Sequence, residues 1–468
     1  MSATAFDFEL LVIGGGPGGY VAAIRGAQKG LKTAVVEKDA LGGICLNWGC
    51  IPTKALLKSA EVMHTLHRSE EFGIKADGIE ADFEKIIARS RDVAQMNSKG
   101  VEFLFKKNKI EHIPGYGKLV DANTVQVLDS EGKEVKKISA KNIIIATGGR
   151  PRSLPGAEFD GEKILSSKEA MILKKAPEKM VIIGAGAIGV EFAYFYNAFG
   201  TEVHLVEMMP HILPIEDEEI STQLERAFKK QKIKLYTDTR VDKVEKTDAG
   251  VKVTVSAKGK EKILEADVAL VAIGILGNVE NLGLEELGIQ VEKNSIKVNE
   301  FYQTAVPNIY AIGDVIGAPW LAHVASHEGI IAVEHLSGGN PHPMDYSNIP
   351  GCTYCHPQVA SVGMTEKKAK EAGYELKIGR FPFRASGKAR AIGELDGMVK
   401  LIFDAKYGEL LGAHIIGPEA TEMIAELGVA KALETTNLEL QHTVHAHPTL
   451  SEAIMEAAAD ASGEAIHI

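Results

Sequence analysis

Two cysteines, Cys45 and Cys50, are the side chains of this sequence best suited to chemistry. They lie in the run 42–54 and make up half of the four cysteines of the chain. A disulfide between them would close a loop too short to add much stability, because the stabilisation by a disulfide grows with loop length. The pair therefore predicts a dithiol that opens and closes in a redox cycle, and this interpretation is favoured over an inert buried pair.

The residues that follow Cys50 are typical of a reactive thiol. Pro52 stands near the start of a helical pattern that runs to about residue 68. A helix N-terminus and the ammonium group of Lys54 both favour the thiolate over the thiol, and the thiolate is the reactive form. We expect thiol–disulfide exchange at this position of the chain.

Two glycine-rich turns predict two dinucleotide sites. Each has the spacing G-x-G-x-x-G, follows an apolar strand and opens a helix, and a glutamate ends the next strand at the same distance in both copies. The glycines let the backbone approach a pyrophosphate at the helix N-terminus, and the carboxylate can accept from ribose hydroxyls. A tight packing turn without a ligand is the weaker alternative. The two sets are Gly14, Gly16 and Gly19 with Glu37, and Gly184, Gly186 and Gly189 with Glu207.

The second glutamate indicates which nicotinamide nucleotide would bind. Glu207 is followed by Met208, Met209 and Pro210, without an arginine pair that could hold a 2′-phosphate. Because a carboxylate repels that phosphate, NAD is favoured over NADP. Two dinucleotides beside a dithiol suggest an electron path through nicotinamide, flavin, disulfide and an external substrate.

The order of apolar strands and helices predicts the fold. Strand 9–13, helix 20–30 and strand 33–37 form a βαβ unit, and the same plan returns from residue 179. From about residue 351 the pattern mixes strands and helices. The predicted fold class is α/β, with two Rossmann-like dinucleotide-binding domains plus a C-terminal α+β domain. The other predicted elements are helices 52–68, 81–107, 419–433 and 450–459, a helix that ends near 199, and strands 111–120, 124–128, 141–146, 179–183, 202–207, 268–274, 399–403 and 411–416. A third region, to about residue 350, contains the run 309–314.

Composition and charge exclude several classes of protein. Hydrophobic residues make up 45% and charged residues 25% of the 468 residues, as in ordinary globular proteins. A net charge of −11 argues against nucleic acid and against an anionic membrane as partners. No leader pattern opens the sequence, and no apolar run approaches the ~20 residues that span a bilayer. We expect a cytoplasmic protein, or one of an organelle matrix if a leader was removed.

The sequence resembles the flavin-dependent pyridine nucleotide-disulfide oxidoreductases over essentially its full length, and within them the dihydrolipoamide dehydrogenases. The resemblance rests on the runs 42–54, 146–148, 313–314 and 445–452, in that order. It implies FAD at the first glycine turn and NAD at the second. The implied reaction is the oxidation of protein-bound dihydrolipoyl groups to the lipoyl disulfide, with reduction of NAD.

The resemblance also implies domains and partners. It predicts an FAD-binding domain over 1–149, an NAD-binding domain over 150–276, a central domain over 277–350 that completes the FAD site, and an interface or dimerisation domain over 351–468. The segment 148–156, rich in Gly and Pro, is the predicted linker. The implied assembly is a homodimer that serves lipoyl-bearing acyltransferase or carrier subunits of 2-oxo acid dehydrogenase or glycine cleavage complexes.

Four catalytic roles follow from the resemblance. Cys50 would lie against the flavin as the thiolate, and Cys45 would exchange disulfides with the substrate. His447, oriented by Glu452, would act as acid and base, and in this family it reaches the flavin of the other subunit. A histidine beside a carboxylate also suits thiol–disulfide exchange on chemical grounds, because its pKa lies near neutrality.

Further positions near the cofactors are implied in the same way. Lys54 and Glu191 would form an ion pair near the reactive edge of the flavin. Asp314 would bond the ribityl chain, and Gly313 would allow its close approach. The remaining implied cofactor positions are Gly117, Thr147, Gly148, Ala322 and Gly274.

Other motifs have competing interpretations. His442, His445 and His447 could be a metal cluster, but no Cys or Asp stands at ligand spacing, so no metal is predicted and His445 is taken as structural. Cys352 and Cys355 form a Cys-x-x-Cys without a second pair or a following helix start, and both are predicted to be ordinary strand residues. For Trp48, packing and flavin tuning both stay open.

Sister enzymes and a docking role are the alternative functions. A glutathione-type reductase would favour NADPH, which Glu207 opposes. Mercuric and large thioredoxin reductases would carry a C-terminal cysteine pair, yet Cys355 is the last cysteine. A soluble transhydrogenase would lack the complete Cys45–Cys50 pair. A subunit whose main task is docking would suit the acidic charge, but it would not need the redox residues.

Overall fold

The computed structural model describes residues 6–468, so the first five residues of the predicted domain 1–149 lie outside the described residues. The chain forms two compact units. The first comprises residues up to 55, 87–152 and 274–344, and the second comprises 56–86, 153–273 and 345–468. The predicted division into four domains stays a prediction.

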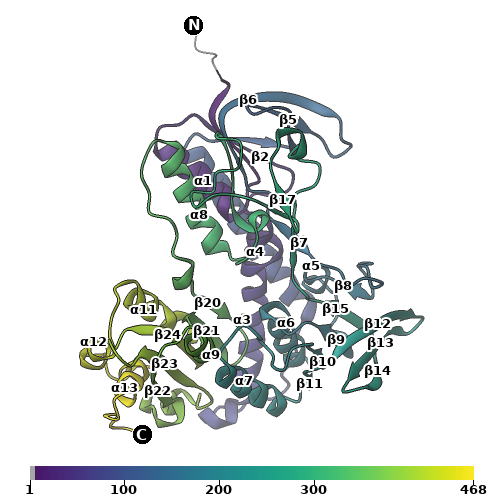
Figure 1. Ribbon diagram of the computed structural model, residues 1–468. Coiled ribbons are helices and arrows are strands. Elements are labelled where there is room, and N and C mark those ends of the chain that lie inside the picture. The colour runs from purple at the N-terminus through teal and green to yellow at the C-terminus, as the bar shows by residue number, and fades with distance from the viewer. Residues whose placement is uncertain (1–5) are drawn as a thin grey trace. The chain divides into compact units, whose positions relative to one another are not determined.

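A seven-stranded sheet is the centre of the first unit (Figure 1). It consists of β1 (Phe8–Ile13), β2 (Thr33–Glu37), β3 (Glu111–Pro114), β4 (Tyr116–Leu119), β5 (Thr124–Leu128), β6 (Glu134–Ile145) and β19 (Ile309–Ala311). The order is β3-β2-β1-β6-β5-β4, and β19 pairs with β6. The end of β6 pairs in parallel with β1 and β19, whereas its beginning pairs antiparallel with β5.

The parallel strands are apolar along their whole length because both faces of the sheet are covered. Leu10 and Val12 of β1 pack with Ala22 and Ala23 of α1 (Pro17–Gln28). Leu11 belongs to the apolar cluster on the other face. A parallel sheet buried on both sides requires such continuous apolar strands.

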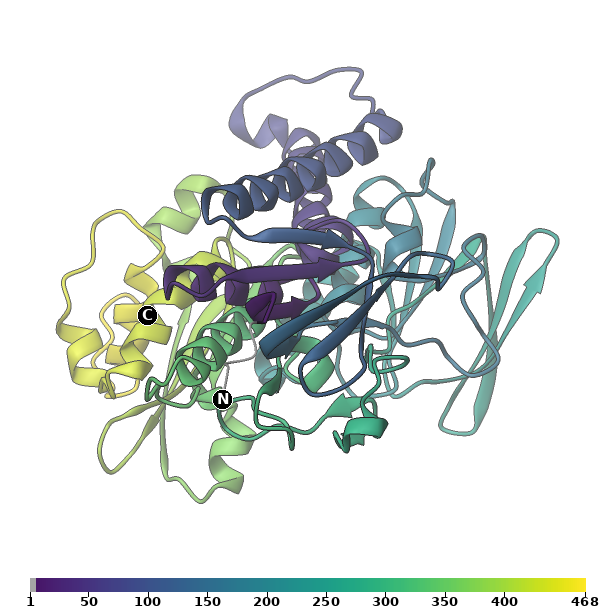
Figure 2. The same ribbon diagram turned by 90° about the horizontal axis from the view of Figure 1, so that it is seen from above.

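Helices α1 and α8 (Ala322–Leu336) lie side by side in both views of the first unit (Figures 1 and 2). Glycines allow this approach: a Cβ at Gly18 would lie 3.1 Å from the Ala325 carbonyl oxygen, and one at Gly329 would lie 2.8 Å from that of Gly18. This unit also contains the short helix α2 (Gly43–Trp48), and it shares α3 (Cys50–His67) and α4 (Phe83–Lys107) with the second unit. Its remaining strands are β7 (Gly149–Pro151), β16 (Ile275–Gly277), β17 (Val291–Glu292) and β18 (Ser295–Ile296).

The second unit repeats the βαβ plan in a five-stranded parallel sheet. Its strands are β8 (Ile164–Leu165), β9 (Lys179–Ile183), β10 (Glu202–Val206), β11 (Lys234–Tyr236) and β15 (Val268–Val271), in the order β11-β10-β9-β15-β8. Its helices are α5 (Ser167–Ala170), α6 (Ala187–Ala198) and α7 (Glu218–Lys230). An antiparallel meander follows as β12 (Arg240–Thr247), β13 (Gly250–Ala257) and β14 (Lys260–Ala266).

The last segment of the second unit forms a five-stranded antiparallel sheet, in the order β20-β21-β24-β23-β22. Its strands are β20 (Gly351–Thr353), β21 (Gln358–Gly363), β22 (Leu376–Pro382), β23 (Met398–Asp404) and β24 (Leu410–Gly417). All residues of β23 and β24 are buried, because the helices that follow cover the sheet. The helices are α9 (Glu366–Glu371), α10 (Gly387–Ile392), α11 (Ala420–Ala432), α12 (Asn437–His442) and α13 (Glu452–Asp460).

The structure confirms the predicted fold class and corrects details of it. The predicted strand 111–120 is two strands, β3 and β4, which are separated at Gly115, where φ is +139°. Cys352 lies in β20 as predicted, but Cys355 follows the strand, so that expectation was wrong for Cys355. No helix of the described residues is long and apolar enough to cross a membrane.

Candidate active site

The dithiol loop packs directly on the first glycine turn. Gly42 and Gly43 have φ values of +96° and +58°, which favour glycine, and they lead into α2. The Gly42 amide donates to the Gly15 carbonyl over 2.8 Å. A Cβ at Gly43 would lie 2.7 Å from the Gly16 Cα. Glycine is therefore required where the two loops meet, and the cysteines are held beside the turn.

The two sulfurs lie in different surroundings. Cys45 is half-buried within α2, whereas Cys50 is exposed and is the first residue of α3. A hydrogen bond with Cys50 raises the pKa of Cys45, burial raises it further, and the charge of Lys54 opposes both effects. These effects favour the protonated form of Cys45, whereas Cys50 stands at a helix N-terminus, where a thiolate is favoured.

Side chains outside the dithiol run hold this loop in place. The Asn47 side-chain amide donates to the carbonyls of Leu41 and Gly43, both over 3.0 Å. Arg91 of α4 donates to the Asn47 carbonyl over 2.7 Å, and its guanidinium lies 4.7 Å from the centre of the Trp48 ring. Trp48 thus packs against Arg91, and flavin tuning by Trp48 stays a hypothesis. Arg91 was not predicted, because nothing in the sequence around an arginine on a long helix shows which distant residues it will contact.

The first glycine turn has the features of a pyrophosphate cradle. A Cβ at Gly14 would lie 2.1 Å from the Ala146 carbonyl oxygen, and one at Gly19 would lie 1.9 Å from that of Gly14. Gly16 is more open, since its nearest neighbour would be 3.8 Å away. It is the N-cap of α1 and makes no side-chain cap. The outer glycines therefore serve packing, while the middle one leaves room in front of a helix N-terminus.

Hydrogen bonds to backbone amides, one of them in the first glycine turn, position the Glu37 side chain. The Gly15 amide donates to its Oε2 over 2.6 Å, and the Asp39 amide donates to its Oε1 over 2.8 Å. A carboxylate has about four lone-pair sites, so this buried side chain can still accept from ribose hydroxyls.

The second turn reproduces this arrangement in the other unit. A Cβ at Gly184 or Gly189 would lie 2.4 Å or 1.9 Å from a backbone carbonyl oxygen, whereas one at Gly186 would meet nothing within 4 Å. The Ala185 and Met209 amides donate to Glu207 over 2.7 Å and 2.9 Å. The residues present fit a second dinucleotide whose ribose would meet a carboxylate.

Asp314 is a half-buried acid in the first unit. Burial raises the pKa of its carboxyl to about 6, and the nearby charge of Glu328 adds to the effect. Glu328 itself accepts from the Gly313 amide over 2.6 Å. A carboxyl in such surroundings gains from hydroxyl donors, and the ribityl chain of a flavin would supply them. No local sequence pattern indicated a role for Glu328.

The other predicted cofactor residues of the first unit lie on the same elements. Thr147 is fixed by two bonds to Asn278: its hydroxyl donates to the Asn278 carbonyl over 2.8 Å, and its carbonyl accepts from the Asn278 side chain over 2.9 Å. Gly148 has a φ of +69° and open space at its Cβ position. The rest lie as follows: Gly117 on β4 against Ile13, Ala322 at the first position of α8, and Gly274 with a φ of +117° before β16.

His447 and Glu452 are brought together as predicted. The His447 Nδ1 lies 2.9 Å from a Glu452 oxygen, and the other Glu452 oxygen accepts from the Thr449 amide over 2.8 Å. Burial acts against ionisation, but these hydrogen bonds lower the pKa of Glu452. The carboxylate orients a side chain that is 78% exposed. His445 contacts Glu426 over 2.7 Å, which fits the structural role predicted for it.

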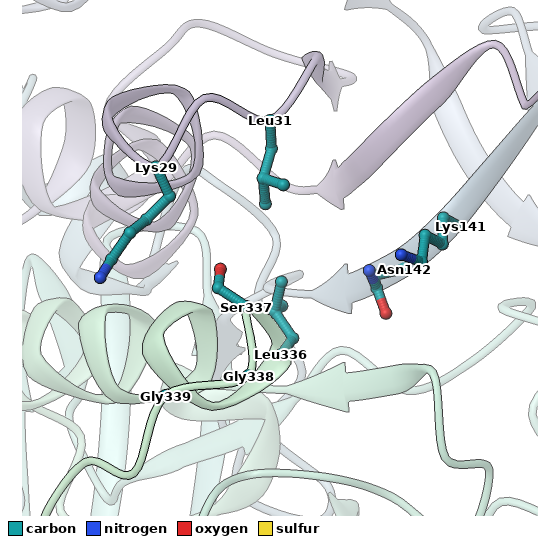
Figure 3. Close-up of a pocket in the computed structure, with 8 residues that line it drawn as sticks. All are labelled: Lys29, Leu31, Lys141, Asn142, Leu336, Ser337, Gly338 and Gly339. Atoms are coloured by element: carbon teal, nitrogen blue, oxygen red, sulfur yellow. The ribbon is translucent and has the colours of Figure 1, made fainter.

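Lys54 and Glu191 belong to different units, so their predicted ion pair stays a prediction. Glu191 of α6 is buried and accepts from the Tyr354 amide over 3.0 Å. The three C-terminal histidines form no metal cluster among residues 6–468. A cavity of about 410 Å³ lies at the C-terminal ends of α1 and α8 (Figure 3). It contains none of the predicted site residues, because the glycine turn is at the other end of α1.

Family models match most of the chain. Residues 8–329 match the model described as pyridine nucleotide-disulphide oxidoreductase, and residues 349–458 match the dimerisation domain of the same family. The chain therefore carries the dimerisation domain as well as the part that contains both glycine turns and the dithiol.

Individual proteins resemble the chain over its whole length. Dihydrolipoyl dehydrogenase of Zymomonas mobilis is 51% identical over 99% of this chain and 100% of the relative, and that of Bacillus subtilis is 48% identical with the same coverage. Among solved structures, LpdA from Mycobacterium tuberculosis matches with a TM-score of 0.89 and 30% identity, over 96% of this chain and 98% of that one. The HOCl-induced flavoprotein disulfide reductase RclA from Escherichia coli matches with a TM-score of 0.85 and 25% identity, over 96% and 99%. A dithiol loop on a dinucleotide-type turn, a second such turn and these full-length matches agree, and the chain belongs to the pyridine nucleotide-disulphide oxidoreductase family.

Proposed function

We propose that this protein oxidises protein-bound dihydrolipoyl groups to the lipoyl disulfide and reduces NAD. The observation that carries the proposal is the contact between the dithiol loop and the first glycine turn, through Gly42, Gly43, Gly15 and Gly16. It holds a Cys45–Cys50 pair beside a site that fits a dinucleotide. The full-length likeness to dihydrolipoyl dehydrogenases supports the choice of substrate.

The exchange step balances at the two cysteines. A substrate thiolate attacks Cys45 of the oxidised pair, and the sulfur of Cys50 leaves as a thiolate. The second substrate thiol then displaces Cys45, so that the lipoyl disulfide forms as the protein pair is reduced. The helix N-terminus at Cys50 stabilises the leaving thiolate. Because the pKa of Cys45 is raised, the displaced Cys45 sulfur takes up the proton that the second substrate thiol loses.

His447 is the base in this proposal. The exposed imidazole takes the proton from a substrate thiol at Nε2, while its Nδ1 is held by Glu452. The ionised Glu452 stabilises the imidazolium that results. We infer a homodimer, in which His447 acts at the dithiol of the second copy.

Two cofactors complete the electron path. Gly14, Gly16, Gly19, Glu37 and Asp314 would hold FAD, which carries an electron pair between dithiol and nicotinamide when bound. The second glycine set and Glu207 would hold NAD. Glu207 already accepts two backbone amides, which fixes its charge where a 2′-phosphate would lie. The protein partners proposed are the lipoyl-bearing subunits of 2-oxo acid dehydrogenase or glycine cleavage complexes.

A steady-state assay tests this function. Dihydrolipoamide with NAD should give rapid NADH formation by the purified flavoprotein, and NADP should replace NAD at least tenfold less efficiently. A lipoylated carrier domain should be oxidised as well. A flavoprotein that reduces disulfides with NADPH, and is inactive with dihydrolipoamide, would overturn the proposal.

A further inference from the structure

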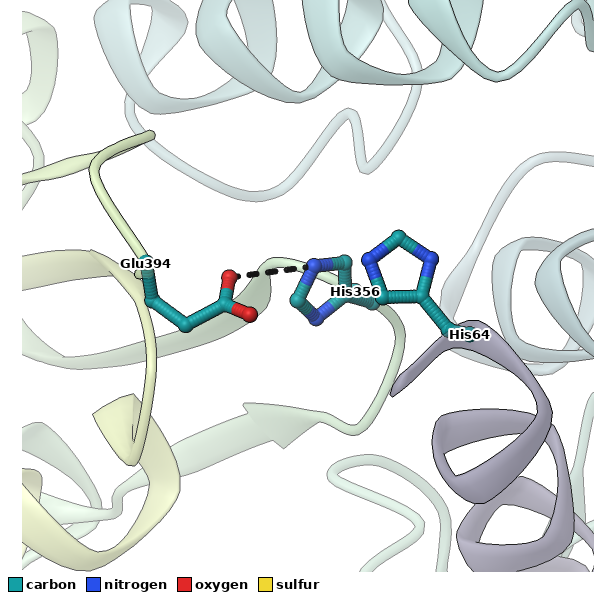
Figure 4. Close-up of side chains that lie close together, drawn as sticks. All are labelled: His64, His356 and Glu394. Carbon is teal, nitrogen blue, oxygen red and sulfur yellow. Dashed lines mark ion pairs between the residues drawn. The ribbon is translucent and has the colours of Figure 1, made fainter. Parts of the chain in front are cut away.

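A cluster of three ligand-type side chains lies in the second unit, apart from the residues assigned above. It consists of His64 near the end of α3, His356 between β20 and β21, and Glu394 after α10 (Figure 4). Each offers one nitrogen or oxygen, and these atoms all lie within 4.8 Å of one another. The two imidazole rings are 4.4 Å apart between centroids.

The donor set and its spacing suit a borderline divalent cation such as Zn²⁺. Two imidazoles and one carboxylate are a zinc ligand set, with metal–ligand distances of about 2.0–2.2 Å. In a tetrahedral site with such bonds, two ligand atoms are separated by roughly 3.3–3.4 Å. The His356 Nε2 lies 3.3 Å from the Glu394 Oε2. Nitrogen donors make Mg²⁺ and Ca²⁺ poor candidates.

Arg68 influences the affinity that we expect of the cluster for a cation. It donates to Glu394 Oε1 and to the Gly393 carbonyl, each over 2.6 Å, and it also pairs with Glu71. It therefore holds the Glu394 carboxylate with Oε2 turned toward His356. Its positive charge also opposes a second cation nearby, so micromolar rather than nanomolar binding is expected.

A buried hydroxyl next to the cluster gives an independent observation. The Tyr194 ring lies 6.1 Å from the His356 ring, and this side chain is only 4% exposed. Its hydroxyl has no hydrogen-bond partner among the described residues. An unsatisfied buried hydroxyl is costly and calls for a partner. A solvent ligand in the fourth position of a metal would supply one.

We propose that His64, His356 and Glu394 form a site for one Zn²⁺-type cation per chain. The metal would join the C-terminal end of α3, the helix that begins at Cys50, to the loops that carry His356 and Glu394. It would act as a structural clamp, and its binding does not depend on the identity of the redox substrate.

Titration of Zn²⁺ into the chelator-treated holoenzyme tests the proposal. The enzyme is kept oxidised, so that Cys45 and Cys50 are not available as thiolates, and binding is followed by calorimetry and by the shift in melting temperature. We expect one Zn²⁺ per chain with a micromolar Kd. In H64Q, H356Q and E394Q the affinity should fall at least tenfold, and Zn²⁺ should no longer raise the melting temperature.

His211→Gln is the matched control. His211 also pairs with a glutamate, Glu225 over 3.1 Å, but it has no third ligand among the described residues. H211Q should bind Zn²⁺ like the unmodified enzyme. Circular dichroism and flavin content show whether each variant is folded, and the three separate substitutions guard against one that is not. Absence of stoichiometric binding, or equal affinity in folded H356Q and H64Q, would overturn the proposal.

Discussion

The two redox cysteines differ in which of them can carry a negative charge. The hydrogen bond with Cys50 raises the pKa of Cys45, whereas Cys50 opens a helix. Cys45→Ser should therefore lower dihydrolipoamide turnover by at least about 10³-fold and leave a long-wavelength flavin–thiolate absorption band. Cys50→Ser should lose both turnover and band. Spectra of the two variants check this, and a band that survives in Cys50→Ser would reverse the assignment.

The proposed acid/base residue, His447, gives the second prediction. His447→Gln should lower kcat for dihydrolipoamide oxidation by about 10²–10⁴-fold, because the base for the substrate thiol is lost. Reduction of the flavin by NADH should change far less, and stopped-flow absorbance measures both. His445→Gln is the control, since His445 contacts Glu426 instead, and it should stay near the unmodified rate. Equal loss of both half-reactions in His447→Gln would remove it from this role.

The half-buried acid Asp314 gives a prediction about stability. Its pKa is raised from 3.8 to about 6, so the native state binds a proton more tightly than the unfolded state between these values. Ionisation of Asp314 should therefore cost the flavin-free protein stability as pH rises from about 4 to 6, up to about 3 kcal/mol above that range. Asp314→Asn should stabilise the apoprotein more at pH 8 than at pH 4, and it should weaken FAD retention.

Denaturant unfolding of the flavin-free protein at both pH values measures this difference. The gain on substitution reflects the removal of a charge from buried surroundings next to Glu328. A gain of the same size at pH 4 and pH 8 would show that the charge of Asp314 is not its source.

At the scale of elements, the glycine turns separate packing from ligand binding. Gly189→Ala places a methyl group 1.9 Å from the Gly184 carbonyl oxygen, so it should destabilise the protein by about 2 kcal/mol or more. Gly186→Ala meets nothing within 4 Å and should cost less than about 1 kcal/mol. It should nevertheless raise the KM for NAD about tenfold or more, because the methyl group would enter the pyrophosphate cradle. Thermal unfolding and steady-state kinetics compare the two, and an unchanged KM in Gly186→Ala would contradict the assignment.

The helices and strands that could be predicted are those whose own residues form a recognisable pattern. Both βαβ units were found from apolar strands, glycine turns and the glutamates that end the second strands. The meander of β12, β13 and β14 was not predicted, although β13 alternates buried valines with more exposed residues. Its two partner strands, β12 and β14, are mostly exposed and charged and so lack an apolar pattern. Helix α2 was also missed, because a helix of six residues is too short to show a helical period of apolar residues.

Site residues divide in the same way. Short motifs contain Cys45, Cys50 and the glycines, and His447 lies five positions from Glu452. These residues could therefore be predicted from the sequence. Arg91 and Glu328 act through contacts that only the fold creates. The cluster of His64, His356 and Glu394 joins residues about 300 positions apart, and no local pattern could have predicted it.

At the scale of the whole molecule, the last segment exposes apolar side chains that a second copy would cover. Val429, Leu433 and Val444 are 62%, 72% and 94% exposed, within or close to the matched dimerisation domain. Val444→Glu should weaken the dimer by placing a charge in the interface, and lipoamide turnover should fall with it because Val444 lies three positions from His447. Light scattering and activity against protein concentration check this. Val135→Glu, at the exposed beginning of β6, is the control, and a fully active monomer would contradict the shared site.

The most direct test of the account is NADH formation from dihydrolipoamide by the purified holoenzyme, measured beside its visible spectrum and repeated with NADP. We expect a flavin spectrum, rapid reduction of NAD and at least tenfold less efficient reduction of NADP. A flavoprotein that leaves dihydrolipoamide unoxidised, and instead reduces another disulfide with NADPH, would contradict both the substrate and the role of Glu207.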